Sequence, residues 1–487
     1  MNLDKPNVIM IMADQFKATA SRLYREKTCH TPHLKKLAEE GVLCRHAFTP
    51  HPLCVPARVS LFTGQYPHTH GARRNETLMP KGAVHAVQCW KEAGYVTGLI
   101  GKNHCFERKE DLDLFDVWCE VGHRGLPNEN AAKGMDWCRP EAGINQAHET
   151  RRKMPDIHPA FSYAVTNYPK EDYATGLIAG QTLQFLEENQ DNPFALWMSL
   201  PDPHTPIEAP AHYVSMIEEE GILFPPWSEE ELEKMPERNR VYYEMMGIAD
   251  ASKDDIKKLM TVYYAMIRFI DDAVGQVVAK LEQLNLREKT MIVFCSDHGD
   301  LTGEHRMADK GGLFYDCLTR IPMIFSWPGN IPSGITEDSM VNLVDVVPTI
   351  LKLQGLNIPA SMQGKPLPVL SEEAPRTVTF AEYGAGGPAF RLKDLETFPE
   401  VHGTQAQMKS LQWREAEGRR KMVRTKAWKY VYDPMDEDDE LYDMVNDPWE
   451  LDNKAADPMF DKVKHEMRQK LLDWSIMTED ARPVPLP

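Results

Sequence analysis

The chain has 487 residues, 42% of them hydrophobic, and its 73 acidic and 55 basic residues give a formal net charge of −18. This length exceeds one small domain and supports a large core, so we expect two domains, or one large domain with a small one appended. Such an acidic surface repels nucleic acid and anionic membranes, and neither is an expected partner; a small anionic substrate is not excluded, because a local basic pocket acts within a Debye length of about 10 Å.

Five short, nearly continuous apolar runs recur along the first part of the chain. They are NVIMIMA (7–13), VTGLIG (96–101), FALWMSL (194–200), MIVFCS (291–296) and IPMIFSW (321–327). Runs of this kind are typical of strands buried on both faces, as in a parallel sheet covered by helices.

Stretches with apolar residues at helical spacing lie between these runs, at 31–41, 174–189 and 257–284. The first is expected to start with Thr31 as its cap, followed by proline, and to end at glycine. The alternation predicts an α/β fold over residues 1–372, with a large, mostly parallel central sheet sandwiched by helices.

The remaining residues, 373–487, show alternating and amphipathic segments in place of continuous apolar runs. They predict a small α+β C-terminal domain with antiparallel strands and a helix. The segment MVRTKAWKYVYD (422–433) alternates like one strand, and the acidic segment 433–443 predicts a turn into a second short strand, with the acidic run 436–440 solvated. Residues 461–477 form an amphipathic pattern typical of a helix.

The N-terminus lacks a basic segment and a long apolar segment, so no signal peptide is visible. We expect a cytoplasmic protein as the sequence is written, or a periplasmic or secreted one if a leader was trimmed. No apolar run approaches the roughly 20 residues of a membrane span. The nine cysteines, from Cys29 to Cys317, show neither a disulfide framework nor zinc-knuckle spacing, which favours a reduced, intracellular chain without structural zinc.

Polar side chains follow four of the predicted strands where each strand ends. They are Asp14, then Lys102, then Asp202 with His204, and finally Asp297 with His298. Ligands in open α/β sheets bind beyond the carboxyl ends of the strands, so these side chains predict one shared site.

The stretch HPLCVPARVSLFTG (51–64) places a cysteine just before a segment that reads as a helix. Pro56 suits a first helical turn, and Arg58 lies four residues after Cys54, on the same helical face. A helix N-terminus offers free N–H groups and partial positive charge to an anion. From this spacing alone, an ordinary buried cysteine before a proline-started helix fits equally well.

The segment CVPARVSLFTG resembles the sulfatase signature, Cys-x-Pro-Ser/Ala-Arg followed by Leu/Phe-Thr-Gly. Further segments resemble sulfatase motifs in the same order along nearly the whole chain: NVIMIMADQ, GLIGKNH, PHTP, SDHGDLTGEHRMADKGGLFYD and, near the C-terminus, KYVYD with ELYDMVNDPWE. The chain is therefore identified as a member of the type I, formylglycine-dependent sulfatases in the alkaline-phosphatase-like superfamily.

The resemblance implies a sulfuric ester hydrolase in which a maturation enzyme oxidises Cys54 to formylglycine (3-oxoalanine). The implied metal ligands are Asp14, Cys54, Asp297 and His298; the implied catalytic residues are Cys54, Arg58, Lys102, His104, His204 and Lys310; the implied substrate contacts are Gln15 and Asn75. In these roles Lys102 steadies the hydrated aldehyde, His104 is the base for sulfate release, and His204 and Lys310 contact the sulfate and protonate the leaving oxygen.

Two positions differ from many sulfatases, which carry a second aspartate at position 15 and an asparagine at 298. Gln15 and His298 instead resemble choline sulfatases and phosphonate monoester hydrolases. Oxygen-rich sites favour Ca²⁺ or Mg²⁺, and an imidazole ligand favours Mn²⁺. We expect a divalent metal, with Ca²⁺ first and Mn²⁺ or Mg²⁺ as alternatives.

The expected substrate is a small-molecule or glycan sulfate ester, with a carbohydrate sulfate first and an aryl or choline sulfate next. A phosphonate monoester or phosphodiester hydrolase on the same scaffold is the main rival, and a non-catalytic sulfated-glycan binding protein is another. Specificity is expected in loops around 105–170, 205–250 and 385–420. Three tryptophans are candidates to stack on a sugar ring, although core packing is the simpler interpretation of each: Trp118, Trp137 and Trp227. The oligomeric state stays open.

Overall fold

The computed structural model describes residues 5–121, 141–154, 161–395, 417–435 and 438–479. Its centre is an eight-stranded sheet with the strand order β12-β2-β11-β8-β1-β6-β3-β4. These strands are β1 (Asn7–Asp14), β2 (Gly41–Phe48), β3 (Val96–Gly101), β4 (Val117–Glu120), β6 (Phe194–Pro203), β8 (Thr290–Ser296), β11 (Met323–Ser326) and β12 (Ile335–Asn342). All five apolar runs are strands of this sheet, and the predicted α/β class is confirmed.

The sheet is mixed, because β11 runs antiparallel to both of its neighbours, β8 and β2. The other pairings are parallel. The sequence did not predict β2, β4 and β12 as strands. β12 lies at an edge of the sheet and carries exposed polar residues, so it lacks the continuous apolar run of a central strand.

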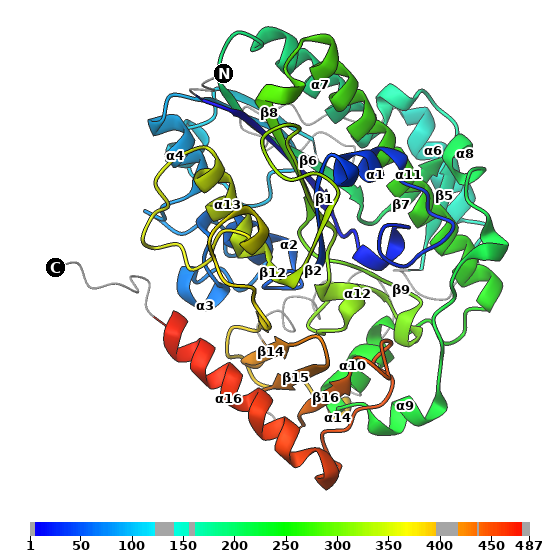
Figure 1. Cartoon of the computed structure of the whole chain (residues 1–487). Coiled ribbons are helices and arrows are strands. Elements are labelled where there is room, and N and C mark those ends of the chain that lie inside the picture. The colour runs from blue at the N-terminus through cyan, green and yellow to red at the C-terminus, as the bar shows by residue number, and fades with distance from the viewer. Residues whose placement is uncertain (1–4, 122–140, 155–160, 396–416, 436–437, 480–487) are drawn as a thin grey trace.

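Helices cover both faces of the central sheet (Figure 1). The helices α1 (Pro32–Glu39), α7 (Ala174–Glu188) and α11 (Lys253–Gln283) pack on one face, and α2 (Cys54–Thr63), α4 (Ala86–Glu92) and α13 (Val346–Leu353) on the other. Residues of β1 alternate between the two cores: Ile9 and Ile11 belong to the first, and Val8 and Met10 to the second. Burial on both faces explains why β1 is apolar throughout.

Helix α1 begins where the sequence predicted, but its cap is different. The Thr31 hydroxyl bonds to Ser21 at 3.0 Å and makes no cap hydrogen bond. The buried carboxylate of Asp271, on α11, instead accepts the free N–H groups of His33 (3.1 Å) and Leu34 (2.7 Å). A residue far away in the sequence thus accepts the hydrogen bonds of the free N–H groups at the start of α1.

A second, four-stranded antiparallel sheet has the order β13 (Thr379–Tyr383), β14 (Arg420–Arg424), β15 (Trp428–Tyr432) and β16 (Glu440–Asp443). The last helix, α16 (Asp461–Thr478), packs on β14 and β15. Figure 1 shows this sheet and α16 together at the lower side of the molecule. This is the small antiparallel C-terminal unit that the sequence predicted.

Two details of the C-terminal prediction were wrong. Residues 422–433 form parts of two strands rather than one, because Thr425 turns the chain: its N–H donates to the carbonyl of Trp428 at 2.8 Å, closing a hairpin. The acidic segment is also only partly solvated. Glu440 is buried and forms an ion pair with Arg238 at 2.8 Å.

The remaining elements are short or lie outside the two main sheets. Two-stranded sheets join β5 (Tyr163–Thr166) to β7 (Ile207–Pro210) and β9 (Leu301–Thr302) to β10 (Ala308–Asp309). The other α-helices are α3 (Pro67–His70), α5 (Lys109–Leu112), α6 (Glu141–Arg151), α8 (Ala211–Val214), α9 (Glu229–Lys234), α10 (Glu237–Met246), α12 (Asp316–Thr319) and α14 (Leu392–Leu395).

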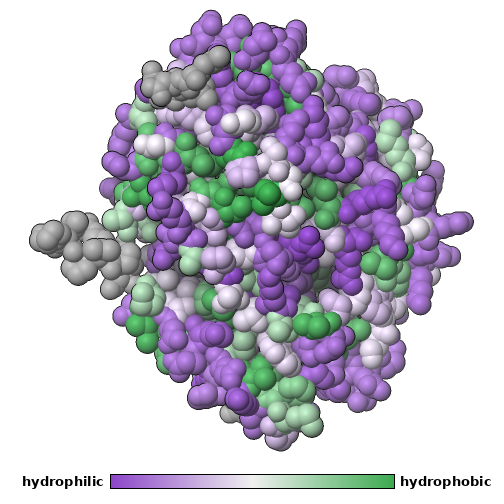
Figure 2. Space-filling model, in the orientation of Figure 1, coloured by the Kyte–Doolittle hydropathy of each residue, from purple (hydrophilic) through white to green (hydrophobic). Residues whose placement is uncertain are grey.

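The surface drawn in Figure 2 is mostly hydrophilic, with apolar residues gathered in several small areas. No helix in the described ranges combines the length and the apolar character that crossing a bilayer requires. Eight cysteines lie in those ranges, and all are free thiols, as predicted.

Candidate active site

Four strands that are neighbours in the central sheet bring polar side chains to one place. The strands β8, β1, β6 and β3 are adjacent and parallel, so their carboxyl ends share one edge. Asp14 ends β1, Asp297 follows β8, and Lys102 follows β3. All three side chains are buried. The structure therefore assembles the site at the edge where the sequence predicted it.

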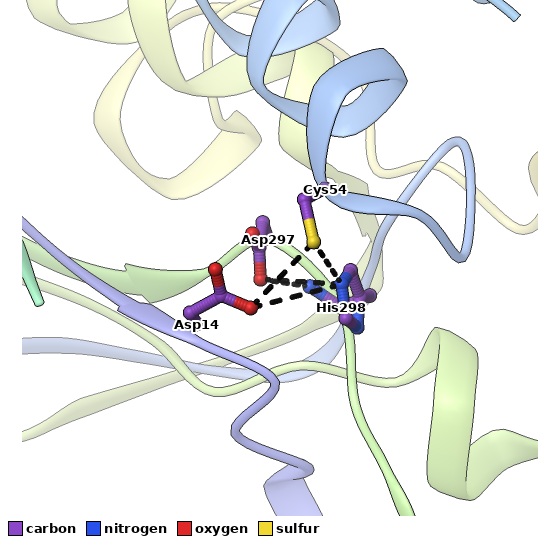
Figure 3. A group of neighbouring side chains, drawn as sticks. All are labelled: Asp14, Cys54, Asp297 and His298. Atoms are coloured by element: carbon purple, nitrogen blue, oxygen red, sulfur yellow. Dashed lines mark hydrogen bonds and ion pairs between the residues drawn. The ribbon is translucent and has the colours of Figure 1, made fainter. Parts of the chain in front are cut away.

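A group of four potential metal ligands lies at this edge (Figure 3). The ligand atoms of Asp14, Cys54, Asp297 and His298 all lie within 4.8 Å of one another, and all four residues are buried. The Sγ atom of Cys54 is 3.2 Å from Nε2 of His298 and 3.7 Å from Oδ1 of Asp14. Side chains from three separate segments thus converge on one point.

The donor set fits a divalent cation. Two buried carboxylates side by side need nearby positive charge, and an imidazole nitrogen completes a mixed oxygen and nitrogen set. The Nδ1 atom of His298 lies 2.8 Å from the carbonyl oxygen of Gly299, so Nε2 turns toward the carboxylates. The atom Nε2 is 3.8 Å from Oδ1 of Asp297 and 3.9 Å from Oδ1 of Asp14.

Arg58 binds both carboxylates of this group. Its Nε donates to Oδ2 of Asp297 at 2.9 Å, and its Nη2 donates to Oδ2 of Asp14 at 3.0 Å. Its Nη1 donates to Oγ of Ser199 at 2.8 Å and to the carbonyl oxygen of Lys102 at 3.1 Å. Burial alone lowers the pKa of Arg58, but Asp297 and Asp14 outweigh it and raise the pKa above its usual value. Arg58 is therefore a fixed buried cation.

The N-terminus of α2 sets the position of Cys54. The helix begins at Cys54, every one of its ten residues is buried, and Arg58 lies one turn on, as predicted. The side chain of Asn75 accepts a hydrogen bond from the N–H of Val55 through Oδ1 at 3.1 Å. Asn75, predicted as a substrate contact, thus holds the first turn of α2 beside residue 54.

Positive charge surrounds the Cys54 thiol. Burial raises the pKa of this thiol, but Lys102, Lys310 and His298 outweigh burial and hold it well below its usual value. Lys102 also acts on Asp14: burial and Cys54 raise the pKa of its carboxyl, whereas Lys102, His204 and Arg58 together bring it far below its usual range. An anion at position 54 is therefore stabilised electrostatically.

Lys102 and His104 both contact the group of potential metal ligands, but they do not lie on an extended strand end as predicted. The sequence predicted an extended strand end, whereas β3 stops at Gly101 and His104 has a left-handed φ of 55°. Lys102 forms an ion pair with Asp14, and His104 hydrogen-bonds to Cys54. Loss of hydration and then the charge of Lys102 lower the pKa of His104, although part of this residue remains exposed. A neutral imidazole with an exposed side suits a general base.

Gln15 links Lys310 to the site. Its Oε1 accepts from Nζ of Lys310 at 2.7 Å, and its Nε2 donates to Oδ1 of Asp309 at 3.2 Å. Gln15 has a left-handed φ of 70°, and its carbonyl oxygen accepts from the hydroxyl of Tyr263 at 2.7 Å. Burial opposes the charge on Lys310, but Cys54 and Asp14 raise its pKa above the usual value. Lys310 is thus a cation directed at the same centre.

His204 follows β6, and its charge contributes to lowering the pKa of Asp14. Its Nδ1 lies 2.6 Å from the carbonyl oxygen of Thr205, and this contact fixes the orientation of the ring. Asp202, in contrast, accepts from the hydroxyl of Thr175 at 2.5 Å and faces α7. The strand end therefore sends one of its two predicted side chains toward the centre.

The two described tryptophans considered as sugar platforms have partners within the protein. Trp118 packs against the second core, and Nε1 of Trp227 donates to the carbonyl of Gly303 at 2.9 Å. Trp137 lies outside the described residues.

The sequence did not identify Tyr263 and Ser199 as site residues. Tyr263 is fully buried on α11, donates to Gln15 and accepts the N–H of Lys17 at 3.2 Å, so it fixes the loop after β1. Its only sequence signal was a place on a long amphipathic helix, which indicates packing. Ser199 lies inside the apolar run of β6, where a lone polar residue that receives Arg58 was the available signal.

This α/β fold around a mixed, mostly parallel sheet, with a buried centre of carboxylates, histidine and cysteine, is that of an alkaline-phosphatase-like hydrolase. The family model described as Sulfatase matches residues 6–356. The choline-sulfatase of Rhizobium meliloti (strain 1021) is 28% identical over 481 residues, covering 94% of this chain and 84% of the relative. The chain belongs to the sulfatase family, and it is a sulfuric ester hydrolase.

Two solved structures share the fold over nearly the whole chain. The phosphonate monoester hydrolase of Agrobacterium radiobacter has a TM-score of 0.76 and 23% identity, covering 97% of this chain and 96% of that chain. A protein determined in complex with its substrate D-glucosamine-2-N,6-O-disulfate has a TM-score of 0.70 and 20% identity, covering 98% and 99%. The fold therefore occurs in enzymes that act on different esters.

Proposed function

We propose that this sulfatase releases inorganic sulfate from a carbohydrate sulfate ester, using a formylglycine made from Cys54 and a divalent metal. The position of Cys54 carries the proposal: it lies at the start of a fully buried helix, among two carboxylates, an imidazole and two lysines. The Sγ atom of Cys54 in this structure lies where an oxygen of the hydrated aldehyde would lie in the matured protein. The cations that lower the pKa of the thiol would equally stabilise such an oxygen and a bound sulfate.

In the first chemical step one hydroxyl of the hydrated aldehyde attacks sulfur, and the bond from sulfur to the alcohol oxygen breaks. The alcohol leaves with a proton, and the sulfate group stays on residue 54. His204 and Lys310 are the proton donors and sulfate contacts in this proposal, because both direct positive charge at the centre.

In the second step His104 takes the proton of the remaining hydroxyl. The carbon–oxygen double bond re-forms, sulfate leaves, and water adds to the aldehyde to restore the diol. His104 suits this role because it hydrogen-bonds to residue 54 and its pKa is lowered, which keeps the imidazole neutral and able to accept a proton. Lys102, paired with Asp14, neutralises charge beside it.

A divalent metal would be held by Asp14, Asp297, His298 and residue 54, and it would supply positive charge to polarise the sulfate ester. We propose Ca²⁺ as the first candidate because two carboxylates dominate the donor set, with Mn²⁺ or Mg²⁺ as alternatives.

The experiment expresses the protein with a formylglycine-generating enzyme and measures sulfate release from 4-nitrophenyl sulfate and from sulfated monosaccharides. Mass spectrometry of the peptide 51–58 should show the thiol replaced by an aldehyde. The variant Cys54→Ala should retain its fold and lose sulfate release, and the variant Cys295→Ala, a buried cysteine of β8, is the matched control. Unchanged turnover in Cys54→Ala would overturn the mechanism.

The second candidate function is phosphonate monoester hydrolysis, and the combination of Gln15 with His298 favours it. Against it stand Lys102 and His104, which both reach residue 54 as a sulfatase-type pair. Relative kcat/KM values for phenyl phosphonate esters and aryl sulfates on the matured protein separate the two activities.

A further inference from the structure

Two guanidinium groups near the site lie close together without a carboxylate partner. Arg73 is half-buried in the loop after α3, and Arg419 is exposed just before β14. Across the described ranges neither side chain forms an ion pair. Burial lowers the pKa of Arg73, Glu382 raises it, and the nearby charge of Arg419 lowers it again. Two like charges held side by side repel each other unless an anion is bound between them.

Both side chains lie against the same short turn, residues 384–386. Nη1 of Arg73 donates a long hydrogen bond of 3.4 Å to the carbonyl oxygen of Gly384. A Cβ atom on Gly386 would lie only 2.8 Å from Nε of Arg419. Gly386 has a φ of +92°, so the turn needs glycine both for its backbone and for the close approach of the guanidinium.

Three carboxylates near this pair are engaged by other groups. Asp433 accepts the backbone N–H of Arg419 at 3.2 Å, and no ion pair joins it to the Arg419 side chain in the described residues. Glu382 accepts from His68 at 2.7 Å and from Lys421 at 3.2 Å. Glu417 pairs with Arg420, so Arg420 is neutralised where Arg419 is not. The positive charge of Arg73 and Arg419 is therefore left for a group outside the described chain.

The pair lies near the loop that leads into α2 and residue 54. The N–H of Glu382, in β13, donates to the carbonyl oxygen of Pro50 at 2.9 Å, and the turn 384–386 follows β13 directly. His51 stacks on Tyr383 with a centroid separation of 5.2 Å. The charges of Arg73 and of the predicted metal ligand His298 both act on His51, so this ring is near Arg73 on one hand and near the candidate metal site on the other.

We propose that Arg73 and Arg419 form a subsite for a second anionic group, a sulfate or a carboxylate, on the same sugar whose sulfate ester is cleaved at residue 54. This inference rests on the proposed function and specifies its substrate class: sulfate esters that carry at least one further negative charge. Arginine suits this role because its planar fork matches the geometry of carboxylate and sulfate oxygens.

The test measures binding and turnover separately, so that the two proposals fail independently. Binding of D-glucosamine-2-N,6-O-disulfate, of other disulfated glucosamines and of D-glucosamine 6-O-sulfate is measured by titration calorimetry in the inactive variant Cys54→Ala. We expect at least one disulfated sugar to bind about tenfold more tightly than the monosulfated sugar, and Arg419→Gln to remove this advantage. In matured protein, Arg419→Gln should leave kcat/KM for 4-nitrophenyl sulfate within about twofold.

The matched control is Arg74→Gln, which removes the same charge from the neighbouring position, where the guanidinium is committed to Glu76 at 2.6 Å. The control should keep the preference for the disulfated sugar. Equal affinity for mono- and disulfated sugars, or an equal loss in Arg74→Gln and Arg419→Gln, would overturn the subsite. Absence of turnover on every sulfate ester, with the binding preference retained, would overturn the proposed function alone.

Discussion

Nε of Arg58 donates a hydrogen bond to Oδ2 of Asp297 over 2.9 Å, and both side chains are completely buried. The same guanidinium bonds to Asp14, so one cation balances the two carboxylates that belong to different strands. Removing it would leave two buried negative charges facing each other, which is among the most costly changes a core can suffer.

In the presence of a chelator that removes the metal, we expect Arg58→Met to lower the free energy of unfolding by about 3–5 kcal/mol. The reason is that the carboxylates of Asp14 and Asp297 lose their counter-charge. Arg58→Lys should recover only part of the loss, since lysine keeps the charge but not the four directed hydrogen bonds. Denaturant unfolding in the presence of chelator measures both. A variant Arg58→Met as stable as the parent would contradict this interpretation of the ion pairs.

Metal removal should abolish activity and lower stability. A chelated sample should regain both on addition of Ca²⁺, Mg²⁺ or Mn²⁺, and at 100 times the dissociation constant the metal should add about 2.7 kcal/mol to the free energy of unfolding. Asp297→Asn should lose this metal-dependent gain. Asp272→Asn changes the other cluster of acidic and histidine side chains in the described ranges, His33 with Asp271 and Asp272, and should keep the gain.

Acid should destabilise the protein through His51. Burial lowers its pKa to about 3, with smaller opposing and supporting effects from Glu382, His70, Arg73 and His298. The unfolded chain binds a proton near pH 6.5 and the folded chain does not, so this contribution is full above pH 6.5 and declines as pH falls toward 3.

Between pH 7 and pH 5.5 the parent should therefore lose about 1 kcal/mol more stability than His51→Phe, which keeps the ring stacked on Tyr383. Denaturant midpoints at the two pH values give the difference. His465→Gln, at an exposed site on α16, serves as the control and should follow the parent. Parallel losses in the parent and in His51→Phe would show that His51 is not buried as a neutral ring.

Asn75→Ala should lower the free energy of unfolding by about 1 kcal/mol, because the first turn of α2 loses the acceptor for the Val55 N–H. If Asn75 also contacts the substrate, KM for sulfate esters should rise in addition. Thermal unfolding and steady-state kinetics separate the two effects. Asn446→Ala, at an exposed asparagine near the end of β16, is the control and should change neither quantity.

Tyr263→Phe should destabilise the protein by about 1–3 kcal/mol, because the buried carbonyl of Gln15 loses its donor. We also expect kcat to fall with KM little changed, since Gln15 orients Lys310. Tyr432→Phe, which loses only a contact with Arg468 near the surface, should change neither. Unchanged kcat in Tyr263→Phe would show that the loop after β1 holds its shape without this hydroxyl.

The sequence predicted five of the eight central strands, because these are almost entirely buried on both faces and leave a continuous apolar signal; it did not predict the inner strand β2, which has exposed and half-buried positions. It did not predict the edge strand β12, whose exposed side chains are polar, and it merged β14 and β15, because alternation continues through the turn that Thr425 forms. Local patterns report burial along a strand, whereas strand direction and edges depend on pairing with distant segments.

The site was predictable to the extent that its residues follow strands or lie on the helix of the cysteine. Asp14, Lys102 and Asp297 could be found in this way. Tyr263 could not, because it lies 248 residues from Gln15 and its position on α11 looks like packing. The cap of α1 could not be predicted for the same reason. Asp271, which is 238 residues from His33, accepts the hydrogen bond that the neighbouring Thr31 was expected to accept.

The burial of α2 has a consequence for the order of events in the cell. Cys54 and the residues that follow it are covered on all sides in the folded chain, and Pro50 is held by Glu382, which the ribosome adds more than three hundred residues later. The maturation enzyme proposed above would therefore have to meet this segment while the chain is still being made or before it has closed. On that proposal, the time between synthesis of the two segments is the window for the modification of Cys54.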